Sequence, residues 1–392
     1  MNELTLDMFQ SAALGALVLI IGIFLVERVA FFRKYCIPSA VVGGLIISII
    51  MLLLHEGGGF EVNIDETFKD ICMNLFFCSI GFMASFSMIK SGGRMVLIVG
   101  GLIGLLIILQ NIVGVVTVSM FGLDPGYGLA LGSISLAGGH GTSAAYGEIL
   151  VEQYGLVGAD AVAVASATVG LAIAGLLGGP LARRLITKHG LTSYEKDAKD
   201  PSIVESVLNK DNLLMAAILL SICIGVGMLM DKAFVSLGIT FPAYFGGLLL
   251  AIVVRNVADY KGFALPMKEI EIVGWLGLCL FLAMALMAIK LWQIADLAGA
   301  MIITLVIQTL IIIVFTYYLV FKVTGKDYES AAMSAGFIGF GIGATPNAVA
   351  NVEAIKKEHG LAPVATFVIP LVGGVVLDVI NVTVLTIALN FL

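Results

Sequence analysis

The sequence has few charged residues: Asp, Glu, Lys and Arg together make up only 12% of its 392 residues. Soluble domains average about 25% charged residues. Because 60% of this chain is hydrophobic, its composition is that of an integral membrane protein, expected to have the lipid bilayer as its surroundings. The net charge of −6 comes without a basic run, so nucleic acid is not an expected partner.

Motifs of enzymes and ATP-driven pumps are also missing. The chain has no phosphate-binding G-x-x-x-x-G-K-[ST], no H-E-x-x-H zinc motif and no G-x-S-x-G elbow, so we expect neither an enzyme nor an organic cofactor. Its five cysteines lack C-x-x-C spacing and lie mostly in apolar runs, as buried hydrophobic residues do. The tail 1–7 is acidic and no cleavage motif follows the first apolar segment, so a cleavable signal is not expected.

Long apolar segments are abundant. A helix needs about 20 mostly apolar residues to cross a bilayer, and ten segments of the chain approach that length, five in each half. The expected spans are 9–31, 37–54, 70–89, 95–121 and 159–182, then 212–230, 239–254, 271–289, 296–321 and 363–390. We therefore predict an all-α integral membrane protein with about ten transmembrane helices.

Two further segments, 127–155 and 329–360, have apolar parts that glycines interrupt before they are long enough to cross. We predict re-entrant hairpins there, because irregular backbone at membrane depth is tolerated only inside protein or along a wet cavity. The charges favour this count. If the hairpins do not cross, the basic segment 183–210 lies inside and the acidic segments 1–7 and 55–65 lie outside, as the positive-inside rule requires. Both termini are then outside, on the periplasmic face.

An odd number of spans in each half makes the two halves inverted relative to each other. The predicted units are a first repeat over 1–186, a cytoplasmic linker over 187–211 and a second repeat over 212–392. Short matches support a duplication: Ile37-Pro38 before Gly43-Gly44 recurs as Phe241-Pro242 before Gly246-Gly247.

The glycine-rich breaks in the two hairpins correspond to each other. One reads Gly138-Gly139-His140-Gly141-Thr142, the other Gly341-Ile342-Gly343-Ala344-Thr345-Pro346-Asn347, and a shift of 203 residues aligns them. Paired breaks at membrane depth indicate the binding site of a transporter. Close helix packing through small residues is the alternative explanation.

A half-helix that begins at such a break presents unpaired N–H groups and a partial positive charge, which suit a carboxylate. Pro346 can start a helix and Thr345 can cap it. The candidate substrate-binding residues are Ser135, Gly138, Gly139, His140, Gly141, Thr142, Gly341, Gly343, Thr345, Pro346 and Asn347.

Polar side chains inside the apolar spans are candidates for holding a cation. Asp378 and Asn381 lie three residues apart in the last span, on one helical face. A buried acid normally faces a partner or a wet path, so Asp378 would bind a cation or a substrate ammonium, or make a structural hydrogen bond. Amides can ligate a cation or cross-link helices. The candidate metal ligands are Asp378, Asn381, Ser133, Gln110, Asn111 and Gln308.

Four segments resemble those of bacterial sodium/glutamate symporters. They are Ser133–Thr142 with Ala144-Ala145, Gly339–Pro346 with Ala348 and Ala350-Asn351, Leu280–Met287 with Lys290-Leu291-Trp292, and Asp378–Asn381. The resemblance implies two inverted five-span repeats with re-entrant loops, a homodimer, and uptake of L-glutamate coupled to Na⁺. This chain differs from the family pattern at four positions: it has Ala137, Ser143, Tyr146 and Asn347 where Ser, Gly, Trp and Thr are expected. These differences affect which anion fits the site.

We therefore expect a secondary active transporter of the bacterial cytoplasmic membrane that imports L-glutamate, or a close anionic amino acid, with Na⁺ by alternating access. A Na⁺-coupled di- or tricarboxylate symporter is the alternative, followed by an ion channel, which also uses re-entrant helices.

Overall fold

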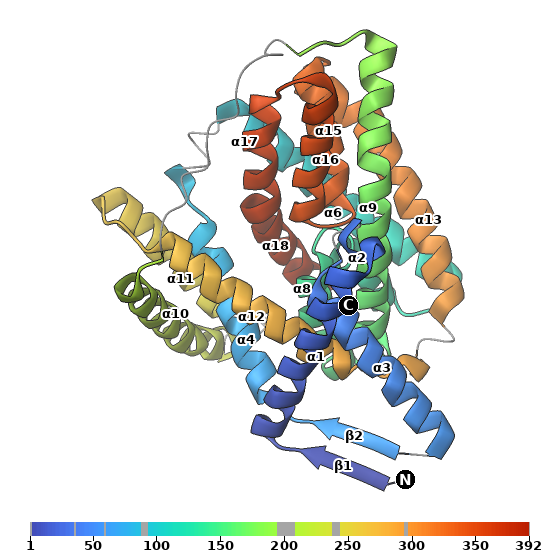
Figure 1. Cartoon of the computed structure of the whole chain (residues 1–392), viewed down its shortest axis with the longest axis vertical. Helices are drawn as coiled ribbons and strands as arrows, with labels where there is room; N and C mark the ends of the chain where they lie inside the picture. Colours follow the sequence, from blue (N-terminus) through green and yellow to red (C-terminus); the bar gives the residue numbers. More distant parts are fainter. Residues whose placement is uncertain are drawn as a thin grey trace.

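Nearly all the regular structure is helical (Figure 1). The computed structural model describes residues 2–34, 37–58, 60–87, 93–193, 208–236, 244–293 and 297–391. Within these ranges eight helices are long and apolar enough to cross a bilayer. The prediction of an all-α, multi-pass membrane protein is confirmed. Most of the predicted linker, and the Phe241-Pro242 pair, lie outside the described residues.

Every predicted span overlaps a helix. Two of these helices, α4 (Thr67–Met83) and α11 (Phe245–Lys261), are not among the eight. Each has 17 residues, which is near the lower limit for crossing a bilayer. The count of ten therefore stays a prediction. The other spans are α1 (Met8–Arg28), α3 (Ser39–Gly58), α6 (Gly93–Met120), α9 (Ala159–His189), α10 (Lys210–Ser236), α12 (Met267–Met287), α13 (Ala298–Phe315) continued by η4 (Thr316–Val320) and α14 (Phe321–Thr324), and α17 (Pro363–Leu371) continued by η5 (Val372–Val376) and α18 (Leu377–Leu389).

The helices pack as two bundles. The first, which we call the α12 bundle, consists of α1, the short α2 (Ala30–Lys34), α3, α4, α10, α11 and α12. The second, the α9 bundle, consists of α6, α9, α13, α14, α17 and α18 with the two glycine-broken segments: α7 (Pro125–Leu129), η1 (Ala130–Ile134) and α8 (Gly139–Glu152), then α15 (Tyr328–Gly341) and α16 (Thr345–His359). Packing is extensive within each bundle, whereas α12 against α8 and α4 against η5 are narrow contacts between them.

Each bundle draws equally on the two halves of the chain. The first three spans of each half form the α12 bundle, and the last two spans of each half, with the broken segment between them, form the α9 bundle. The spans of the two halves are therefore divided between the bundles in the same way.

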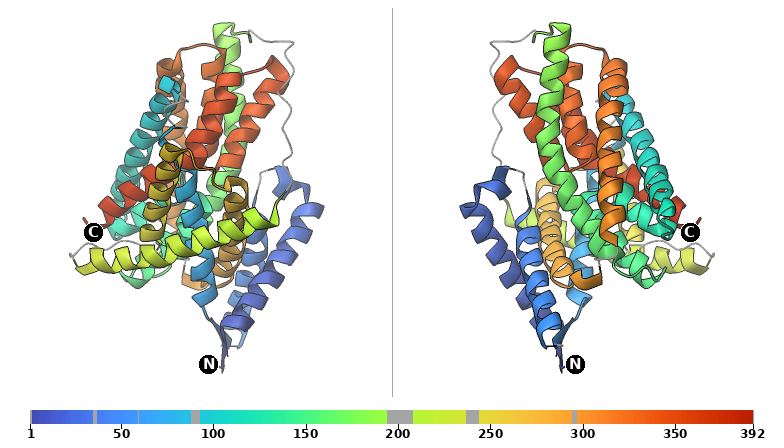
Figure 2. Two further views of the ribbon diagram at one scale, coloured as in Figure 1. Left: turned by 90° about the vertical axis from the view of Figure 1, so that its left-hand side faces the viewer. Right: turned by 90° about the vertical axis from the view of Figure 1, so that its right-hand side faces the viewer.

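The two ends of the molecule differ (Figures 1 and 2). A parallel ribbon of β1 (Asn2–Leu6) and β2 (Phe60–Ile64), which the sequence did not indicate, lies at one end with the N-terminus. The strands run parallel because each leads directly into a helix that leaves this end, α1 or α4, and Ser11 Oγ accepts a hydrogen bond from the Asp65 N–H. The basic C-terminal end of α9 lies at the opposite end. The acidic tail and the basic C-terminal end of α9 are thus on opposite sides.

Glycines allow the closest helix crossing in the α12 bundle. A Cβ atom at Gly22 of α1 would overlap the Ser39 carbonyl oxygen, and one at Gly43 of α3 would overlap that of Val18. Backbones therefore touch at this crossing, as they do where small residues drive helix association in membranes.

We predict that Gly22→Leu destabilises the fold, because the overlap is with backbone and no rotamer change can relieve it. The cost should be about 1–3 kcal/mol, typical of overpacked sites. The melting temperature in detergent measures it. Gly101→Leu is the control, since a Cβ at Gly101 of α6 meets no other atom within 4 Å, and an equal loss there would contradict the explanation.

Candidate functional site

The first broken segment changes backbone conformation several times within a few residues. Asp124 caps α7, accepting a hydrogen bond from the Gly126 N–H, and Pro125 starts that helix. Gly132, with φ −98° and ψ −131°, interrupts η1, and after residues 135–138 the chain enters α8 at Gly139, whose φ is +63°. Such a positive φ favours glycine, which explains part of the Gly-rich run. The segment is thus two half-helices with an irregular turn between them.

The second broken segment is a simpler pair of helices. Asp327 caps α15 by accepting from the Ser330 N–H at 2.7 Å, and α15 and α16 lie side by side (Figure 1). Pro346 stands in the first turn of α16, as predicted. The predicted capping role of Thr345 is wrong: the cap residue is Ala344, with extended backbone and no side-chain hydrogen bond, so Thr345 is already helical.

The two breaks meet. A Cβ atom at Gly139 would lie 3.2 Å from the Gly343 carbonyl oxygen. Between the bundles, next to this contact, is a cavity of about 260 Å³, which we call the central cavity. The predicted residues that line it are Gly138, Gly139, His140, Gly141, Thr142, Gly343, Thr345, Pro346 and Asp378. The structure therefore brings the tips of both broken segments and the acid of the last span, Asp378, to one place.

The electrostatics of the central cavity come mainly from backbone. The N-terminal ends of α8 and α16 both face it, and each presents N–H groups without helical partners and about half a positive charge. Among the described lining residues, Asp378 is the one acidic side chain and there is no lysine or arginine. His140 Nε2 lies 3.0 Å from Thr168 Oγ1 of α9, which holds the ring at the tip. The cavity can thus bind two carboxylates through backbone and one cation through Asp378.

The predicted amides brace the breaks from behind the central cavity. Gln110 of α6 donates through Nε2 to the Gly341 carbonyl at 2.8 Å, and Gln308 of α13 donates to the Gln110 carbonyl at 2.7 Å. Asn347 donates to the Leu171 carbonyl at 3.1 Å. Of the two roles considered for mid-span amides, helix cross-linking is therefore present in the structure.

A second set of contacts holds the first break. Asn111 Oδ1 accepts from the Ser133 N–H at 2.9 Å, and Asn381 Nδ2 donates to the Ser133 carbonyl at 3.3 Å. Ser135 Oγ donates to the Gly132 carbonyl at 3.3 Å. Since carbonyl and N–H groups freed by a broken helix must be satisfied in the apolar interior, these side chains take over that task.

Some buried oxygens near the first break find no hydrogen-bond donor among the described residues. They include Ser133 Oγ and Asn381 Oδ1, and further off Gln110 Oε1 and Gln308 Oε1. An oxygen left in this state is costly unless a cation or water fills the site. Asn111 differs, because Ser133 already uses its oxygen and its unpaired atom is the amino nitrogen, which cannot ligate a cation. Ser133 and Asn381 therefore fit Na⁺ better than Asn111 does, and Asn381 lies one helical turn from Asp378.

The residues that the sequence did not indicate form the opposite wall of the central cavity. Phe76, Phe77 and Ile80 come from α4, and Leu278 and Leu282 come from α12. Each set follows one helical face, but in a membrane protein an apolar face equally indicates lipid. No polar break marks them, so the sequence offered no signal.

Comparisons with known proteins show which family this chain is similar to. Residues 4–361 match the family model described as sodium/glutamate symporter. The chain is 37% identical to a sodium/glutamate symporter of Escherichia coli over 97% of this chain and 96% of that one. It is 34% identical to a sodium/glutamate symporter of Haemophilus influenzae, over 98% and 97% of the two chains. Among solved structures, a sodium proton antiporter of Methanocaldococcus jannaschii aligns over 97% of this chain and 98% of its own, with 13% identity and a TM-score of 0.44.

We predict that Gln110→Leu lowers stability by about 1–3 kcal/mol, because the Gly341 carbonyl at the end of α15 loses its donor in an apolar interior. Gln308→Leu is the matched control. Its amide serves a carbonyl inside α6 that the helix itself can satisfy, so the loss should be smaller. Melting temperatures of both variants in detergent test this, and a larger loss for Gln308→Leu would contradict it.

Proposed function

The chain belongs to the sodium/glutamate symporter family, and we propose that its central cavity binds one L-glutamate between the tips of the two broken segments and couples its uptake to Na⁺. The family is one of transporters, so the predictions of a symporter and of a protein that is not an enzyme are confirmed. The central cavity then has to account both for the choice of glutamate and for the coupling to Na⁺.

The observation that carries the proposal is the charge pattern of the central cavity. L-Glutamate has two carboxylates and one ammonium group. The central cavity offers two helix N-termini, those of α8 and α16, and one carboxylate, Asp378. Two positive ends and one negative group therefore match the three charges of the substrate. The substrate-binding residues are those predicted at the tips, with Thr142 and Thr345 adding hydroxyl donors.

The same pattern gives a reason for Na⁺. Glutamate and Asp378 together bring two net negative charges, whereas two helix N-termini supply about one positive charge. No lysine or arginine among the described lining residues provides the rest. One bound Na⁺ restores the balance. Asn381 Oδ1, one helical turn from Asp378, and Ser133 Oγ, on the residue whose carbonyl Asn381 Nδ2 bonds, are unpartnered oxygens that could hold it. Each ligand then stabilises the binding of the other, which is the reciprocal linkage that symport needs.

The two bundles support a particular form of alternating access. Both tips and Asp378 belong to the α9 bundle, whereas the α12 bundle contributes an apolar wall of aromatic and aliphatic side chains. The bundles are also offset along the long axis, with the α9 bundle extending further at the end where α9 terminates (Figure 2). We propose that the α9 bundle slides along this wall and carries the substrate, because an apolar wall opposes such motion less than interlocking polar contacts would.

Other parts of the architecture belong to the same proposal. The two broken segments are re-entrant hairpins, and residues 1–186 and 212–392 are inverted five-span repeats. The division of each half between the two bundles supports a duplication. The ribbon end faces the periplasm of a bacterial inner membrane, with both termini on that side, and the acidic tail and basic α9 end agree with it. The protein acts as a homodimer, as the family resemblance implies.

Uptake by the purified protein in proteoliposomes tests the function. We expect labelled L-glutamate to accumulate above its external concentration when Na⁺ is higher outside, and to equilibrate only when choline replaces Na⁺. Unlabelled L-glutamate should compete, and citrate, which has no ammonium for Asp378, should not. Competition by citrate alone would indicate the tricarboxylate alternative, and gradient dissipation without accumulation would indicate a channel.

Asp378→Asn tests the charge balance. It removes one negative charge from the central cavity, so we expect Na⁺ to bind more weakly. The half-saturating Na⁺ concentration for uptake should rise about tenfold or more, equivalent to about 1.4 kcal/mol. Thr383→Ala is the control, since Thr383 is an exposed polar residue of the same helix. An unchanged Na⁺ dependence in Asp378→Asn would remove Asp378 from the site.

A further inference from the structure

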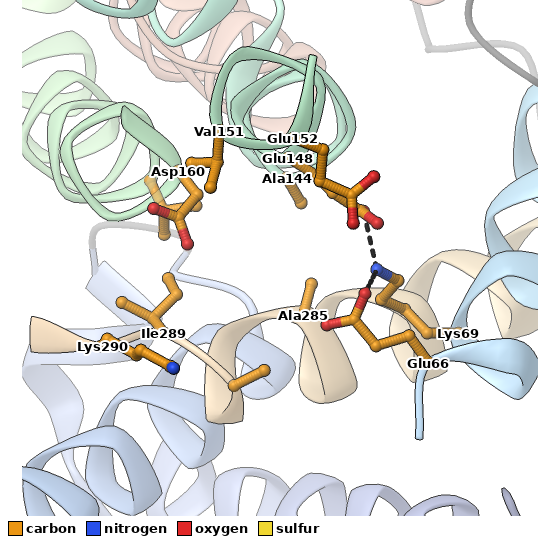
Figure 3. A pocket seen from close by; sticks show the side chains of 12 residues that line it. Glu66, Lys69, Ala144, Glu148, Val151, Glu152, Asp160, Ala285, Ile289 and Lys290 are labelled. Atoms are coloured by element: carbon orange, nitrogen blue, oxygen red, sulfur yellow. Dashed lines mark hydrogen bonds and ion pairs between the residues drawn. The ribbon is translucent and has the colours of Figure 1, made fainter. Parts of the chain in front are cut away.

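A second cavity separates the two bundles at the ribbon end of the molecule (Figure 3). Its volume is about 240 Å³, and we call it the outer cavity. Glu66 and Lys69 of the α4 region and Lys290, which follows α12, line one side, and the α9 bundle lines the other with Glu148 and Glu152 of α8 and Asp160 of α9. It is far more charged than the central cavity.

We propose that Lys69 and Glu148 form the gate of this transporter on the ribbon side, an ion pair that joins the two bundles in the present state and breaks in each transport cycle. The inference rests on the proposed movement of the α9 bundle against the α12 bundle. It adds a role for two residues that lie outside the central cavity.

The ion pair is buried on its lysine side and crosses from one bundle to the other. Lys69 Nζ lies 2.6 Å from Glu148 Oε2, and the Lys69 side chain is only 3% exposed. By contrast, Arg183–Glu358 joins two helices of the α9 bundle and is about half exposed, and Arg255–Asp259 lies within α11. A buried pair is much more strongly coupled than an exposed one, so the Lys69 bridge can hold the bundles together.

Both partners can tolerate separation. Lys69 Nζ is also 2.6 Å from Glu66 Oε2 and 3.6 Å from Asp70 Oδ1, both on its own bundle, so its charge stays compensated when Glu148 leaves. Glu148 is 25% exposed and borders the outer cavity, where water can reach it. This asymmetry distinguishes a reversible bridge from a structural ion pair, whose separation would strand a buried charge.

The ammonium also accounts for the acidic residues around it. Glu66, Glu148 and Glu152 have carboxylate oxygens within 4.8 Å of one another, a spacing that could hold a metal ion. Lys69 already donates to two of these carboxylates. The Lys69 ammonium therefore already neutralises part of the negative charge of this cluster. We assign the three carboxylates to the Lys69–Glu148 bridge and not to a metal site.

The position of the bridge along α8 connects it to the substrate. Thr142 of the central cavity and Glu148 lie six residues apart on α8, about 9 Å along the helix axis. The side chains of α12 and of the residues just after it continue from one cavity to the next. Leu278 and Leu282 line the central cavity, and Ala285 and, two residues past the end of α12, Ile289 line the outer one. Movement of α8 toward the ribbon end would carry the tip to the outer cavity, and it requires Glu148 to leave Lys69.

Accessibility of a cysteine at Ala285 tests the gate. The five native cysteines are replaced by alanine, Ala285→Cys is introduced, and a membrane-impermeant maleimide is applied to each face of the membrane separately. Glu148→Gln removes the bridge but leaves Lys69 with Glu66. We expect labelling from the ribbon face to become about tenfold faster, which corresponds to about 1.4 kcal/mol.

Glu66→Gln is the matched control. It removes the same charge from the same lysine and the same cavity, but its partner lies within the α12 bundle. Labelling should stay at the parent rate. An equal increase in both variants would show that cavity charge and not the bridge controls access, and no increase in Glu148→Gln would show that the bridge does not hold the bundles. Either result overturns the proposal.

A further variant, and the conditions of the labelling assay, keep the result interpretable. Glu148→Asp, which keeps the charge but shortens the side chain, should give a smaller increase and replaces Glu148→Gln if that variant does not fold. Labelling needs neither glutamate nor Na⁺. The expected increase in labelling can therefore be absent while the unmodified protein still takes up glutamate, or present when it does not. The gate and the transport function are thus tested independently.

Discussion

In the function that we propose, the structure depends on one electrostatic constraint: an acidic substrate must be bound in an apolar interior without a cationic side chain. The described wall of the central cavity has no lysine or arginine, and it has a carboxylate of its own in Asp378. The positive potential therefore has to come from helix N-termini, which exist at membrane depth only where helices are broken. Both broken segments, and the requirement for Na⁺ that we propose, result from this arrangement.

A broken helix in turn needs support, because its freed N–H and carbonyl groups have no water to bond with. Gln110, Asn111 and Asn381 supply that support at the Gly341 carbonyl and at both backbone groups of Ser133. The bonds fix each half-helix relative to α6 and α18. As a result the tips can be held rigid although they are glycine-rich.

The sequence predicted the parts of this arrangement that interrupt a simple pattern. Glycine runs in apolar segments located both tips, and Asp378 was conspicuous in an apolar span. It did not predict how the spans divide into two bundles, because apolar helical faces look alike whether they meet lipid, another helix or substrate. The cap of α16 was misassigned by one residue, since Thr345 and Ala344 differ in backbone conformation rather than in any pattern. Lys69 and Glu148, 79 residues apart, gave no local signal at all.

In the transport cycle that we propose, different forces act at the two cavities. At the central cavity the bundle proposed to move meets the other through apolar contacts, which have no preferred register and allow sliding. At the outer cavity they meet through a partly buried ion pair, whose hydrogen-bonded geometry fits one register and whose attraction weakens as the two partners separate. A transporter needs discrete end states joined by a low barrier. The ion pair lies at one end of the apolar interface, so it stabilises one end state without adding polar contacts along the path between states. Glu66 keeps Lys69 paired after Glu148 has left.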